Sequence, residues 1–65
     1  MEYKKLLREA LASAKASGLT QADIARKSGV SHVTVHHWLT NSSTPTILNL
    51  AAVINACGKQ LKVSL

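Results

Sequence analysis

The chain has 65 residues, 46% of them hydrophobic and only 3% aromatic, and its eight lysines and arginines against three acids give a formal charge of +5. A single domain of this size has little room for a deep pocket, so we expect no enzyme and no cofactor. The basic balance favours a polyanionic partner, and the lack of a long apolar run or a signal-like start predicts no membrane contact and a cytoplasmic location.

The first predicted helix covers residues 2–19. Apolar residues recur there at helical spacing and form one stripe, which consists of Tyr3, Leu7, Ala10, Leu11 and Ala14. Gly18 stands where a residue with a positive φ would end the helix. We therefore expect the chain to begin with a helix that buries one side.

A second, short helix is predicted over residues 20–29. Thr20 is a favourable N-cap residue, Asp23 suits the positive end of a helix, and Gly29 can supply the positive φ of a sharp turn. The buried side of this helix is expected to consist of Ala22, Ile24 and Ala25.

Residues 31–40 predict a third helix, with Ser31 as its N-cap and Val30 packed inside the turn before it. Three apolar residues spaced i, i+3 and i+4 form its expected buried face, namely Val35, Trp38 and Leu39. This spacing assigns the tryptophan to the core and leaves the other face of the helix for a partner.

The opposite face of the third helix carries no carboxylate and consists of His32, Val33, His36, His37 and Thr40. In the major groove of DNA an exposed valine can meet a thymine methyl group, and a histidine can donate to guanine. His32 and His36 are also spaced like two metal ligands, but no third ligand is near them in sequence, so we expect no metal site. Catalysis through Ser31 or Cys57 has no base and acid placed beside it. The remaining alternative is that the histidines only cover a solvated helix face.

A fourth helix is predicted over residues 46–57, after the polar loop NSSTPT, and Gly58 closes it. Its apolar residues are Ile47, Leu48, Leu50, Ala51 and Ile54. Residues 59–65 change period, because apolar residues there alternate with polar ones as in a strand.

The predicted strand has no partner strand in its own chain, and a lone strand is not stable. The simplest partner is the same strand of a second copy, antiparallel across a two-fold axis. We therefore expect a homodimer interface that consists of Leu61, Lys62, Val63, Ser64 and Leu65. The alternatives are a frayed tail and an extended segment packed on its own domain.

Residues 21–39 resemble the helix-turn-helix of the lambda-repressor and Cro-like regulators. The matching positions are Gln21, Ala25, Gly29, Val35 and Trp38. The resemblance implies an all-α, four-helix lambda-repressor-like DNA-binding domain over residues 3–58, with the helix-turn-helix at residues 20–40 and the C-terminal β-strand added for dimerisation at residues 59–65. The face of the third helix and the resemblance together predict base contacts by Ser31, His32, Val33, His36 and His37.

Contacts to the DNA backbone are expected at helix N-termini and in the polar loop after the third helix. Free N–H groups and the helix dipole attract phosphates at such termini, and these contacts carry no sequence information. The predicted set is Thr20, Gln21, Lys27, Thr40, Asn41, Ser42, Ser43, Thr44 and Thr46.

These features predict a sequence-specific regulator of transcription that binds double-stranded DNA. We expect a repressor that binds a palindromic operator as a homodimer in the cytoplasm, associated with the nucleoid of a bacterium or of a phage-infected cell. The alternative is an antitoxin-like interaction module that holds a partner protein and autoregulates its own operon.

Overall fold

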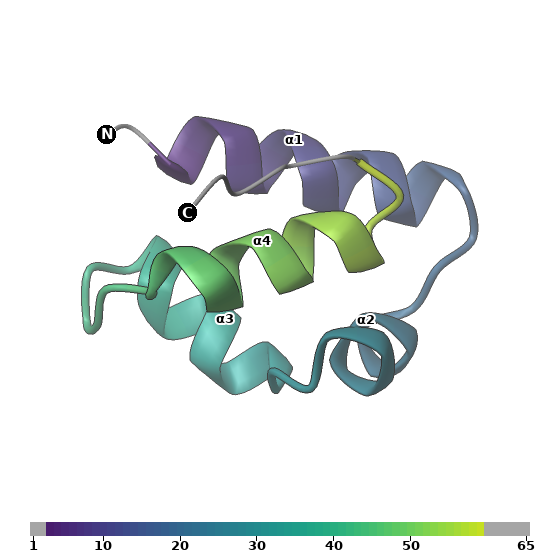
Figure 1. Cartoon of the computed structure of the whole chain (residues 1–65). Coiled ribbons are helices and arrows are strands. Elements are labelled where there is room, and N and C mark those ends of the chain that lie inside the picture. Colours follow the sequence, from purple (N-terminus) through teal and green to yellow (C-terminus); the bar gives the residue numbers. More distant parts are fainter. Residues whose placement is uncertain (1–2, 60–65) are drawn as a thin grey trace.

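The computed structural model describes residues 3–59, which form four α-helices. The helices are α1 (Tyr3–Ala16), α2 (Gln21–Ser28), α3 (His32–Leu39) and α4 (Ile47–Ala56), as Figure 1 shows. Within residues 3–59 the chain forms no strand. The predicted dimer strand, from Leu61 to Leu65, lies outside the described residues. None of the helices between Tyr3 and Lys59 is long and apolar enough to cross a membrane.

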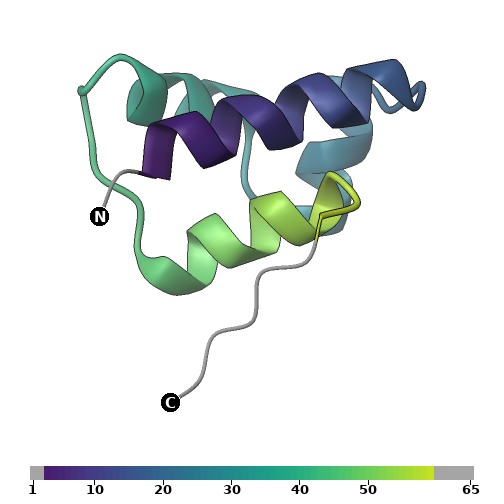
Figure 2. The ribbon, with the colours of Figure 1, turned by 90° about the horizontal axis from the view of Figure 1, so that it is seen from above.

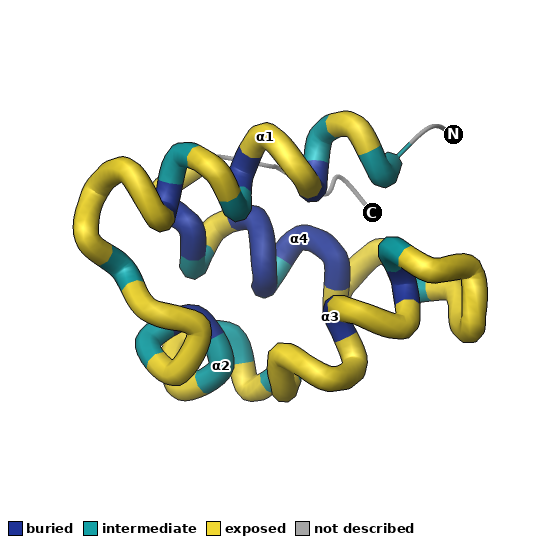
Figure 3. Tube along the Cα trace, turned by 180° about the vertical axis from the view of Figure 1, so that it is seen from behind, coloured by how far each residue is buried: buried dark blue, intermediate teal, exposed yellow. Residues whose placement is uncertain are grey.

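The fourth helix lies at the centre of the domain. It packs against α1 on one side and against α2 on another, while α3 packs against α2 (Figures 1 and 2). Ten side chains from all four helices and their ends form one core: Leu7, Ala10, Ala14, Ile24, Val35, Trp38, Leu50, Val53, Ile54 and Cys57. Helix α3 is thus held on one side and exposed on the other (Figure 3).

Short polar side chains fix where three of the helices begin. Thr20, Ser31 and Thr46 are the N-caps of α2, α3 and α4, and each hydroxyl accepts a hydrogen bond from the backbone N–H three residues later. The predicted helix starts are therefore confirmed. The first helix ends at Ala16, and the predicted turn at Gly18 is confirmed: Gly18 has φ 85°, and the Leu19 amide donates to the Ala14 carbonyl at 2.9 Å.

One prediction about the core of α2 is wrong. Ala22 was expected on the buried side, but it is exposed, whereas Ile24 is buried and Ala25 is half-buried. Two residues correspond to about 200° around an α-helix, so Ala22 and Ile24 point in opposite directions. The buried thiol of Cys57 fills the core near the end of α4, and its burial raises the pKa of the thiol.

Candidate nucleic-acid interface

The turn between α2 and α3 is short and internally bonded. Gly29 ends α2 with φ 75°, and its amide donates to the Ala25 carbonyl at 2.8 Å. The Ser28 hydroxyl accepts from the Val30 amide at 3.1 Å, and the Val30 side chain packs against the core. Because both ends of the turn are fixed in this way, the angle between α2 and α3 is set by the domain itself.

Helix α3 is anchored through one face. Val35 and Trp38 are 6% and 3% exposed, which confirms their predicted core positions. The Tyr3 hydroxyl donates to the Trp38 carbonyl at 3.2 Å, so the second half of α3 is also tied to α1. The opposite face therefore stands on a fixed support, as a rigid recognition surface requires.

The centre of the exposed face of α3 carries Val33 and His37. Val33 is 51% exposed and His37 is exposed, and helical geometry places both roughly opposite Val35. Neither α3 nor its N-cap contains a carboxylate, so this face has no charge that would repel phosphate. An aliphatic group and an imidazole thus project outward together, where a major groove could receive them.

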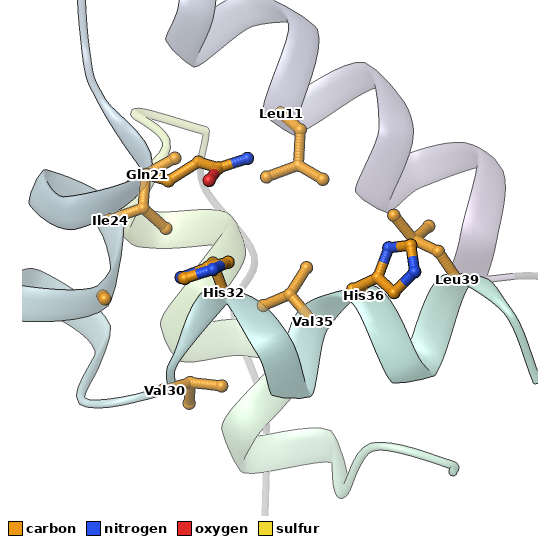
Figure 4. A pocket seen from close by; sticks show the side chains of 9 residues that line it. Leu11, Gln21, Ile24, Val30, His32, Val35, His36 and Leu39 are labelled. Atoms are coloured by element: carbon orange, nitrogen blue, oxygen red, sulfur yellow. The ribbon is translucent and has the colours of Figure 1, made fainter. Parts of the chain in front are cut away.

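The two other histidines lie on the flank of α3 that faces α1 and α2. His32 and His36 are exposed, but they line a half-open pocket of about 100 Å³ together with Leu11 and Gln21. Figure 4 shows His32 beside Gln21 at one end of the pocket and His36 beside Leu39 at the other, with Leu11 pointing in from α1. The structure therefore divides the predicted base-contacting histidines into one at the centre of the face and two at its edge.

Ser31, the fifth residue predicted to contact bases, has a structural role at the start of α3. Its hydroxyl accepts from the Thr34 amide at 3.2 Å and lies 3.1 Å from the Thr34 hydroxyl. Sequence reasoning did not single out Thr34, which is exposed on α3 next to this cap. The spacing of a serine and a threonine three residues apart at a helix start was the available signal.

The start of α2, where we predict a phosphate contact, already holds a carboxylate. The Thr20 amide donates to Asp23 at 3.0 Å, and the Thr20 hydroxyl accepts from the Asp23 amide at 3.1 Å, which forms a capping box. The bond from the Thr20 amide, followed by that from Arg26 at 2.7 Å, lowers the pKa of Asp23 to about 2. Asp23 is therefore charged at neutral pH, and Gln21, beside the cap, is exposed.

The polar loop after α3 folds back over the end of that helix. The Ser42 amide donates to the His37 carbonyl at 2.9 Å, and Asn41 adopts the left-handed conformation with φ 65°. The Thr40 hydroxyl donates to the His36 carbonyl at 3.1 Å. All the residues of this loop that were predicted to contact the DNA backbone are exposed, and they follow directly after α3: Thr40, Asn41, Ser42, Ser43 and Thr44.

The two remaining predicted backbone contacts, Lys27 and Thr46, belong to α2 and to the start of α4. Lys27 is exposed near the end of α2. The Thr46 hydroxyl caps α4 by accepting from the Asn49 amide at 3.2 Å. The structure also places Lys4 beside the loop that follows α3, since its ammonium donates to the Asn41 side-chain oxygen. Sequence reasoning missed Lys4, because only the packing of α1 brings it to the end of α3.

A metal centre has no support from the geometry of residues 3–59. No three histidine, cysteine or acidic side chains of this part of the chain come together as ligands would. His32 and His36 remain a pair on one flank of α3.

A family model described as Helix-turn-helix matches residues 7–63, which include all of α2, α3 and α4 and most of α1. Neither the curated proteins nor the solved structures contain a match to the chain.

Proposed function

The chain belongs to the Cro/C1-like helix-turn-helix family of DNA-binding regulators, and we propose that it represses transcription by covering a palindromic operator as a homodimer. The exposed face of α3 carries the proposal. Val33 and His37 project from that face without a carboxylate beside them, while Val35 and Trp38 anchor the helix from behind. Repression of this kind needs only binding, and we propose no catalytic step.

In the proposed complex, α3 lies in the major groove. Val33 contacts the methyl group of a thymine, and His37 donates to a base edge beside it. His32 and His36, at the flank, contact base edges or phosphates nearer the wall of the groove. Gln21 and the residues of the loop after α3 hold the backbone on either side and so fix the register of the helix.

A dimer is proposed because one helix contacts only a few base pairs. Two copies of α3 set about 34 Å apart would read two half-sites on one side of the duplex, and a two-fold axis makes the operator palindromic. We place the interface in the strand predicted over residues 59–65. A second surface is available on α4, where Ile47 and Leu48 are 45% and 60% exposed.

Selection of bound duplexes from a random DNA pool tests the proposal. We expect enrichment of two inverted half-sites with centres about 10–11 base pairs apart. No enrichment over the input pool would contradict sequence-specific binding. Enrichment of a single asymmetric site would contradict the two-fold dimer, and it would favour the alternative module that holds a partner protein.

Sedimentation of two variants locates the interface. Removal of residues 59–65 should give a folded monomer with much weaker operator binding. Leu48→Glu, which places a charge on the exposed face of α4, should leave the dimer intact. The opposite pair of results would move the interface to α4.

A further inference from the structure

One edge of α1 carries a row of cations that the predicted contacts do not include. Lys4, Arg8, Leu11 and Lys15 are spaced i, i+4, i+7 and i+11, so they lie along one side of the helix. We name Lys4, Arg8 and Lys15 the basic edge. Arg8 and Lys15 are exposed, and Lys4 is half-buried.

The packing of α1 places the whole row beside α3 and the start of α2. Lys4 donates to the side chain of Asn41, immediately after the end of α3. Leu11 lines the pocket that His32 and His36 border, as Figure 4 shows. Lys15 lines a groove with Thr20 and Gln21, at the start of α2. The basic edge therefore runs from the end of α3 to the start of α2.

The charges of Arg8 and Lys15 in the basic edge are available to a partner. Within residues 3–59, Asp23 forms an ion pair with Arg26. Neither Arg8 nor Lys15 pairs with a carboxylate in this part of the chain. Glu9 lies about 130° around the α1 axis from the middle of the edge. The edge thus presents positive charge without a neighbouring acid on the same side of the helix.

We propose that the basic edge contacts the phosphates of one strand of the same duplex that α3 enters. From Lys4 to Lys15 the helix rises about 16 Å, and one strand of B-DNA offers a phosphate every 3.4 Å or so along its axis. The row is therefore long enough to reach more than one phosphate of that strand. Because the edge borders the flank of α3, it lies at a wall of the groove when α3 is inside it. This proposal rests on the proposed DNA-binding function.

The salt dependence of operator binding tests the basic edge. Arg8→Gln and Lys15→Gln each remove one phosphate contact per protomer, so the slope of log K against log salt should fall by about 1.8 for the dimer. At 0.15 M salt each variant should bind roughly 30-fold more weakly. Preference for the operator over random DNA should stay unchanged, since phosphate contacts carry no sequence information.

Lys5→Gln is the matched control. Lys5 is exposed on the same helix, loses the same charge on substitution, and points about 90° away from the basic edge. Thermal melting of all three variants checks that the fold is kept. If Arg8→Gln and Lys15→Gln keep the slope of Lys5→Gln, the basic edge does not contact phosphate, although the proposed function stands. If the unsubstituted protein shows no salt-dependent DNA binding, the proposed function itself fails.

Discussion

Val33→Ala should weaken operator binding by an amount that the structure sets. The substitution removes two methyl groups, which are worth about 1.6 kcal/mol when fully buried. Val33 is 51% exposed in the protein alone, so about half of that burial, or about 0.8 kcal/mol, remains to be gained on DNA. This corresponds to roughly fourfold per half-site and roughly 14-fold for a dimer on two half-sites.

The contact can be separated from other effects of the substitution by changing the DNA as well. Replacing thymine with deoxyuridine removes the methyl group that Val33 is proposed to touch. At the contacted position this replacement should weaken binding of the unsubstituted protein and have almost no further effect on Val33→Ala. Fluorescence anisotropy with the four combinations measures the coupling between the two groups.

The same replacement at thymines elsewhere in the operator is the control. There the effects of the protein and DNA changes should add. If they add at every thymine of the operator, Val33 touches no thymine methyl group, and our placement of α3 in the groove is wrong.

The remaining predictions concern the domain that supports the interface. Trp38→Ala should cost about 3–5 kcal/mol of unfolding free energy, because a large side chain that is 3% exposed leaves a cavity in the core; a cooperative urea transition like that of the unsubstituted chain would contradict this. The pKa of Asp23, lowered to about 2 in the folded state, lies below its ordinary value of 3.8, so Asp23 stabilises the fold above about pH 4 and stops doing so as the pH falls towards 2. The melting temperature of Asp23→Asn should therefore fall less between pH 4 and pH 2 than that of the unsubstituted protein, and equal falls would show that the charged form of Asp23 adds no stability.

Local chemistry in the sequence determined where the helices begin and what one face of α3 buries. Thr20 and Ser31 were predicted to cap two helices, and they do, because a cap needs only the residues of the following turn. The fourth helix was predicted to start at residue 46, and Thr46 is its N-cap. Val35 and Trp38 were placed in the core from their spacing alone. Gly29 was predicted to supply the positive φ of a sharp turn, and it does, because such a turn depends on the conformation of one residue.

Only the tertiary structure decided which residues from distant parts of the chain share a surface. Helical spacing groups His32 and His36 with His37, but α1 and α2 pack beside two of them and leave the third facing outward. Which face of α4 is buried also depends on the neighbouring helices. They bury Val53 and leave Leu48 exposed. The basic edge of α1 lies more than twenty residues before Asn41 in the sequence. It lies beside α3 and the loop after it only because the core fixes α1 against α3 and α4. Contacts of this kind depend on how the helices pack, and no periodicity within a single helix can encode them.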